Sequence, residues 1–127
     1  MEKLNLVKEI LETITLNLTE YKLDTDFLGE LKKELPDTAL LITEVFPKDE
    51  LEEIYKSFSP YLEDNKILPF ASTLGDSNFC IGFSKENFGK IYYQDFDFGL
   101  FKVTDSMESF IKALRKKDTK DYLLLGE

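Results

Sequence analysis

Residues 67–94 read ILPFASTLGDSNFCIGFSKENFGKIYYQ, and this stretch decides the fold class. Along residues 78–84 apolar side chains alternate with small or polar ones, which is the period of a β-strand with one face on a core. The triplet Asn87-Phe88-Gly89 is typical of a tight reversal, so residues 90–94 predict a partner strand running back. Residues 67–71 predict a further strand before a Gly-Asp-Ser turn.

The segments outside this stretch show both helical and extended patterns. The apolar spacing predicts helices over residues 4–11, 28–35, 51–62 and 107–114, and strands over residues 13–19, 39–46 and 100–103. The start and stop signals are a cap at Thr25-Asp26 with Pro36 as terminator, capping boxes at Asp49 with Glu52 and at Asp105 with Glu108, and a basic helix end at Arg115, Lys116 and Lys117. The apolar tail over residues 122–125 is expected to dock on the body. Strands grouped in the middle with helices at the sides predict one α+β domain over residues 1–127, with a mainly antiparallel or mixed sheet flanked by helices.

Composition limits the partners that this chain can bind. It has 127 residues, a net charge of −9 and a pI of about 4.6. Such a field repels a phosphate backbone and attracts basic proteins, so we expect a protein partner and no nucleic acid. The opening residues 1–4 show no leader pattern, the chain has one cysteine, and no apolar run approaches the roughly 20 residues of a membrane span. We therefore expect a cytoplasmic protein with no membrane contact.

The sequence offers little catalytic equipment. Histidine is absent and Cys80 is the only cysteine, which excludes Cys/His dyads, Ser-His-Asp triads and His/Cys zinc sites. No phosphate-cradling G-x-x-x-x-G-K or G-x-G-x-x-G motif is present. Nothing basic adjoins Cys80 to activate it, so a small packed residue in a strand is the preferred interpretation. We expect a protein that is not an enzyme and that needs no cofactor or metal.

One stretch interleaves aromatic and acidic side chains. Asp95-Phe96-Asp97-Phe98-Gly99 could hold a cation, but it lacks the rest of a calcium loop, and a turn between two strands explains it better. A contact patch for a basic protein is a further hypothesis, because tyrosine is favoured in hot spots and aspartate steers encounter. Its candidate contacts are Tyr92, Tyr93, Asp95 and Asp97. The alternative is a strand whose rings fill the core.

Four short segments together resemble a known family. They are Leu68-Pro69-Phe70-Ala71, Asn78-Phe79-Cys80, Asn87-Phe88-Gly89-Lys90-Ile91-Tyr92-Tyr93 and Asp105-Ser106-Met107-Glu108-Ser109-Phe110. In this order, over residues 67–114, they resemble the SUKH superfamily, also called the Smi/Knr-type family. The resemblance implies an α+β fold and a non-enzymatic role. Bacterial members resemble immunity proteins that neutralise contact-dependent or polymorphic toxins, and fungal relatives act in cell-wall regulation and signalling.

Three functions remain open at this point. The first is an immunity protein whose acidic surface binds a basic toxin domain, such as a nuclease. The second is a regulatory adaptor or scaffold without a toxin partner. The third is an enzyme that uses two carboxylates, which would require a deep pocket with two convergent acids of perturbed pKa.

Overall fold

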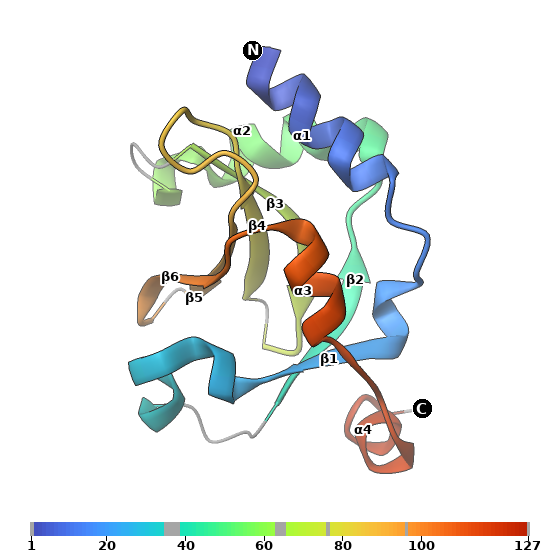
Figure 1. Ribbon diagram of the computed structural model, residues 1–127. Helices are drawn as coiled ribbons and strands as arrows, with labels where there is room; N and C mark the ends of the chain where they lie inside the picture. The colour runs from blue at the N-terminus through green and yellow to red at the C-terminus, as the bar shows by residue number, and fades with distance from the viewer. Residues whose placement is uncertain (1, 35–38, 63–65, 76, 96, 127) are drawn as a thin grey trace.

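A computed structural model describes residues 2–34, 39–62, 66–75, 77–95 and 97–126 of the chain (Figure 1). With η marking 3-10 helices, the elements in chain order are α1 (Glu2–Glu12), η1 (Leu18–Glu20), β1 (Tyr21–Asp24), η2 (Thr25–Glu34), β2 (Ala39–Val45), η3 (Lys48–Glu50), α2 (Leu51–Leu62), β3 (Ile67–Thr73), β4 (Asn78–Gly82), β5 (Ile91–Asp95), β6 (Gly99–Thr104), α3 (Met107–Ala113), β7 (Arg115–Lys116) and α4 (Thr119–Leu124). The strands form one sheet in the order β6-β5-β4-β3-β2-β1-β7, in which all the pairs described are antiparallel. The predicted α+β fold with an antiparallel sheet is confirmed.

The stretch over residues 67–94 folds as three consecutive strands, as predicted. β3 pairs with β4 and β4 pairs with β5, with Phe79 opposite Tyr93 and Cys80 opposite Tyr92. The reversal between β4 and β5 is held by Asn87, whose Oδ1 accepts hydrogen bonds from Ser84 N at 2.9 Å and Ser84 Oγ at 2.7 Å. The predicted strands over residues 39–46 and 100–103 are β2 and β6.

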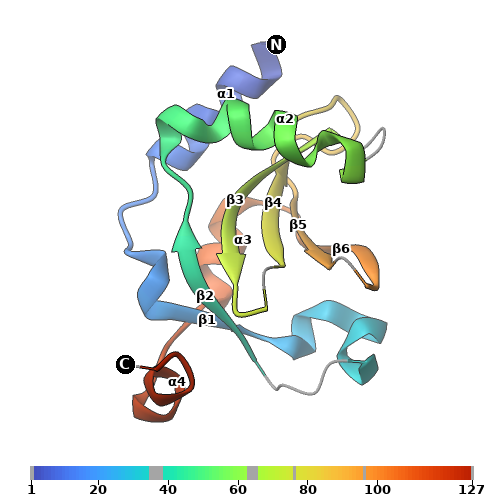
Figure 2. The same cartoon turned by 180° about the vertical axis from the view of Figure 1, so that it is seen from behind.

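One main core lies between the sheet and the helices that cover it. Phe70, Phe79 and Phe110 are the largest fully buried side chains, and Phe110 brings α3 against the rings of the other two. α1 contributes the side chains of Leu4, Val7 and Leu11 to the same core. Figures 1 and 2 show α1 and α2 together at one end of the sheet, and α4 at the opposite end, projecting from the body.

The strand predicted over residues 13–19 is wrong. The backbone N–H of Thr13 donates to Ile10 O and that of Ile14 donates to Leu11 O, so the first of these residues finish the last turn of α1. Asn17 then caps η1, and the strand begins only at Tyr21. The alternating residues span the end of α1, a loop and the start of η1. Leu18 is buried at 2% exposure and Leu16 is exposed at 37%, so these side chains do not share one sheet face.

Both predicted capping boxes are wrong. Pro47 precedes η3 without any side-chain cap, and Glu52 instead accepts a hydrogen bond from Lys8 Nζ of α1 at 2.6 Å. α3 is capped by Ser106, one residue later than predicted, while Asp105 pairs with Lys102 at 2.8 Å. In each case a cation from a neighbouring element takes a carboxylate away from the predicted box, Glu52 in one and Asp105 in the other.

Two other predicted segments differ from the structure. The helix expected over residues 28–35 is a 3-10 helix, interrupted at Gly29 where φ is +58°. Its predicted end at Leu35 and Pro36 lies outside the described residues, and so do the side chains of Leu31, Phe58 and Leu62. The basic run over residues 115–117 does not end a helix: Arg115 and Lys116 form β7 against β1, and Lys117 is buried. The apolar tail over residues 122–125 lies mostly in α4.

We expect a large stability effect at Gly82. A Cβ atom there would lie 2.3 Å from the Asn87 carbonyl oxygen. The turn cannot move away from the added Cβ atom, because two hydrogen bonds hold it against Gly82. The N–H of Gly82 donates to Lys90 O and its carbonyl accepts from the N–H of Gly89, both at 2.9 Å. Gly82→Ala should lower the free energy of unfolding in urea by about 2–3 kcal/mol. The control Lys85→Ala, exposed in the same turn, should stay within about 0.5 kcal/mol, and an equal cost for both would contradict this explanation.

Candidate functional site

The two predicted tyrosines lie on opposite faces of β5, because successive strand residues point to opposite sides. Tyr93 is only 2% exposed, and its ring centroid lies 5.4 Å from that of Phe79 in the core. A side chain buried to this extent is not presented to a partner, so the structure argues against Tyr93 as a contact residue. Tyr92 lies on the other face, partly exposed, beside Cys80 and Leu100.

The acidic part of the predicted set forms the turn between β5 and β6. Asp95 Oδ1 accepts hydrogen bonds from the backbone N–H groups of Asp97 at 2.8 Å and Phe98 at 3.0 Å. Its Oδ2 accepts from Ser77 Oγ at 3.3 Å. Gly99 completes the turn at φ +103°, a region that side chains disfavour. The predicted turn is confirmed, and Asp95 is part of its framework, while Asp97 projects into solvent.

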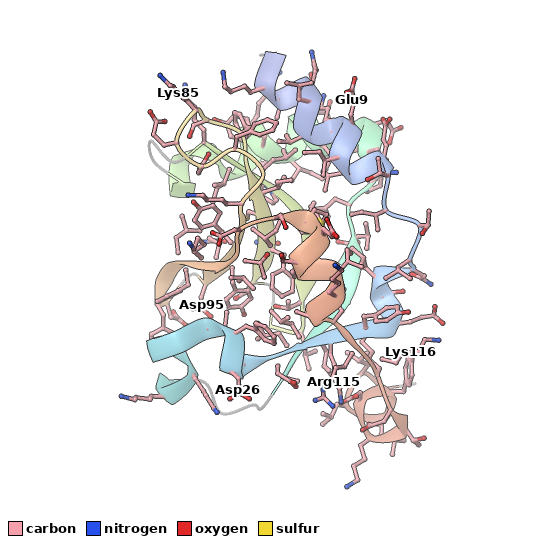
Figure 3. The ribbon with its side chains drawn as sticks, in the orientation of Figure 1. Glu9, Asp26, Lys85, Asp95, Arg115 and Lys116 are labelled. Atoms are coloured by element: carbon pink, nitrogen blue, oxygen red, sulfur yellow. The ribbon has the colours of Figure 1, made fainter. Side chains whose placement is uncertain are left out.

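The structure adds two exposed phenylalanines that the predicted contact set lacked. Phe98 follows Asp97 in the turn and is 44% exposed, and Phe27 of η2 is 42% exposed. η2 packs against β6, and Figures 1 and 2 both show it beside the tip of the β5–β6 hairpin. Figure 3 shows Asp95 at that tip, on one side of the η2 ribbon, with Asp26 on the other side. We call the residues Asp95, Asp97, Phe98 and Phe27 the hairpin patch, and Tyr92 lies on the opposite face of β5 from the core.

All of this patch except Phe27 comes from the one stretch of interleaved aromatic and acidic residues. Phe98 belongs to the interleaved stretch, and it is exposed because the turn held by Asp95 directs it outward. Phe27 comes from a segment about 70 residues earlier in the sequence, so no local pattern could have linked it to the hairpin. Phe96, between the two aspartates, lies outside the described residues.

A second candidate surface lies beside α4. A hollow of about 550 Å³ separates α4 from the sheet, with Leu74 and Leu124 on its rim. These leucines are 50% and 68% exposed. Polar groups, including Lys117 and Glu20, also line the hollow. Neither this hollow nor three others in the described part of the chain bring together two carboxylates.

The other side chains that could react or bind a metal form no candidate site among the described residues. Cys80 is fully buried, and burial raises the pKa of its thiol well above the ordinary value, which keeps it protonated. Across the described ranges, no group of three or more Cys, Asp or Glu side chains is placed to hold a metal ion. No helix within those ranges is long and apolar enough to cross a membrane.

The comparison with known proteins identifies the family. The RhsPI family matches residues 17–115, which is more than three quarters of the chain and includes the whole sheet except the last residue of β7. No curated protein matches the chain. The hairpin patch lies inside the matched range, whereas α1 and α4 lie outside it. The chain belongs to the RhsPI family, a family of Rhs-associated immunity proteins of polymorphic toxin systems.

Proposed function

We propose that this protein binds and neutralises a cognate Rhs toxin in the cytoplasm, without catalysing a reaction itself. Membership of the RhsPI family is the observation that carries the proposal. The predicted resemblance to the SUKH superfamily is part of the same proposal. It is supported by the antiparallel α+β fold and by the place of its four segments, which fall on β3, on β4, on the turn leading into β5, and on the start of α3.

The toxin face that this protein covers is basic, such as the substrate-binding face of a nuclease. The net charge of −9 supports this choice. Exposed carboxylates that form no ion pair within the described residues occur on several elements, among them Glu44, Asp49, Glu50, Glu53 and Asp97. A protein with such a surface is attracted to the face of a nuclease that attracts nucleic acid, and its bulk then excludes the substrate. Asp95 and Asp97 of the hairpin patch, and Tyr92 on the outer face of β5, remain proposed contributors.

A rescue assay tests this function. The reading frame immediately upstream is expressed in a bacterial host with and without this protein, and survival is counted. We expect the toxin to kill and this protein to restore growth through a complex that co-purifies. The association rate of that complex should fall steeply between low and physiological salt, because exposed charges steer the encounter.

Two outcomes of this assay would count against the proposal. If the neighbouring product kills cells regardless of this protein, the immunity function is wrong. If that product is harmless, the adaptor hypothesis takes precedence. If the association rate does not depend on salt, the proposal of a basic toxin face is wrong, but the neutralising function stands.

A further inference from the structure

We propose that Phe98 and Phe27 anchor the toxin on the hairpin patch, and that they receive a toxin surface carrying arginine or lysine side chains. This inference rests on the proposed function, since the partner is the cognate toxin. It differs from the sequence-based hypothesis in the choice of side chains that contact the toxin. The phenylalanines make the contact, and Asp95 is a positioning residue that holds one of them outward.

Exposure is the first argument. Phe27, Phe88 and Phe98 are the exposed phenylalanines in the described part of the chain, while Phe70, Phe79, Phe83 and Phe110 are buried. Phe88 lies alone in the β4–β5 turn, at the far end of β5 from the hairpin tip. Phe27 and Phe98 come from two elements, η2 and the β5–β6 turn, that lie side by side. Large aromatic side chains at the centre of a contact surface are the usual anchors of a protein interface.

Rigidity is the second argument. The Phe98 backbone is fixed by its hydrogen bond to Asp95, which is in turn tied to Ser77 of the neighbouring β3–β4 turn. Leu28, next to Phe27, is buried in the core at 3% exposure and so fixes the first turn of η2. A phenylalanine side chain has only two rotatable bonds. Anchors presented in this way lose little conformational entropy on binding.

Charge selects the kind of partner. Asp97 is exposed beside Phe98 and forms no ion pair with any described residue, whereas Lys32 of η2 is paired with Asp26. An aromatic face beside a free carboxylate suits a guanidinium or ammonium group, which binds the ring face and the carboxylate together. The same carboxylates disfavour a nucleic acid.

The first experiment measures binding of the purified toxin domain from the upstream reading frame, at fixed salt. We expect Phe98→Ala and Phe27→Ala each to raise Kd by about 30-fold, the loss typical of a hot-spot residue. Phe88→Ala, matched in residue type and exposure at 39%, should change Kd by no more than about threefold. Thermal melting of each variant checks that it is folded.

Asp95 is tested by a pair of substitutions. Asp95→Asn keeps an oxygen acceptor for the two backbone N–H groups, so it should bind within about threefold of the wild type. Asp95→Ala removes the acceptor and should weaken binding nearly as much as Phe98→Ala. If Asp95→Asn is as weak as Asp95→Ala, Asp95 acts through its charge and its role as a positioning residue is wrong.

A labelling experiment avoids any effect on the core. Because Cys80 is fully buried, Asp97→Cys would carry the accessible thiol among the described residues. A bulky maleimide adduct at that position should abolish toxin binding, whereas the same adduct on Glu86→Cys, exposed in the β4–β5 turn, should leave it intact.

The outcomes separate this inference from the proposed function. If the wild type does not bind the toxin, the proposed function fails. If the wild type binds and the phenylalanine variants and the Asp97→Cys adduct bind equally well, the anchors are wrong while the function stands. Loss of binding on Leu124→Ser alone would move the interface to the hollow beside α4 and would likewise overturn this inference.

Discussion

Phe110→Ala should cost about 3–5 kcal/mol of unfolding free energy, because it opens a cavity at the centre of the core. Phe110 is 0% exposed, and its ring centroid lies 5.0 Å from that of Phe79 and 5.9 Å from that of Phe70. Those two rings belong to central strands and cannot move into the space. α3 spans only seven residues, too few to be stable alone, so it depends on this contact.

Urea denaturation followed by circular dichroism measures this effect. A typical domain is stable by only about 5–15 kcal/mol, so the variant should unfold at a much lower urea concentration. The matched control is Phe88→Ala, which removes the same ring from a site that is 39% exposed, and it should cost no more than about 0.5 kcal/mol. A cost below about 1 kcal/mol for Phe110→Ala would mean that α3 does not pack as described.

The sheet could be predicted because its signals are local. Residues 78–83 alternate between core-facing and opposite side chains, and Asn87 to Gly89 reverse the chain between strands that are neighbours in sequence. Neither feature depends on a distant segment. The same reasoning explains why β3, β4 and β5 lie within a few residues of their predicted bounds.

The failures arise where several contacts compete for the same residues, some of them nearby and some far away in the sequence. Ser106 and Asp105 could both cap α3, and the nearby Lys102 of β6 decides the matter by taking Asp105. Arg115 and Lys116 look like a helix end, but β1, more than 90 residues earlier, pairs with them and makes them a strand. A single-sequence pattern contains no information about which distant element will be adjacent.

The candidate site shows the same division. The alternation of β5 places Tyr92 and Tyr93 on opposite faces, and the register that sets Tyr93 opposite the core residue Phe79 decides which of them is buried. The turn at Asp95 was predictable from Asp-x-Asp-x-Gly, whereas the hydrogen bond that Ser77 of the neighbouring hairpin donates to the Asp95 carboxylate was not. The turn therefore follows from local sequence, whereas the burial of Tyr93 and the contact from Ser77 depend on tertiary structure.

The second large effect is expected at the buried ion pair that attaches α4 to β1. Lys22 Nζ lies 2.6 Å from Asp121 Oδ2, with side chains 9% and 12% exposed. Lys22→Met leaves the Asp121 carboxylate buried with only its hydrogen bonds from the backbone, such as that from Asp118 N. We expect it to cost about 3 kcal/mol, whereas Lys22→Met with Asp121→Leu should recover most of this loss, because no charge is then left buried.

Amide hydrogen exchange measures the loss of local stability in α4, and urea denaturation measures the loss of global stability. The control is the exposed pair of Arg115 and Asp24, whose side chains are 58% and 28% exposed. Arg115→Met should cost less than about 1 kcal/mol, although it breaks a contact to the same strand. If the two single variants cost the same, burial is not what makes the Lys22 pair important.

The pH dependence of α4 follows from the same pair. Burial alone raises the pKa of Asp121, but the hydrogen bonds from Lys22 and from the Asp118 backbone outweigh it, so the pKa lies below the ordinary 3.8. A carboxyl group with a depressed pKa contributes stability that is complete above its unfolded pKa and is lost as pH falls through the folded value. Exchange in α4 should therefore be independent of this group near neutral pH, once the intrinsic rate is corrected, and should accelerate below about pH 4. Asp121→Asn should remove that acid-induced step. A step of unchanged size in Asp121→Asn would show that a different carboxylate holds α4 in place.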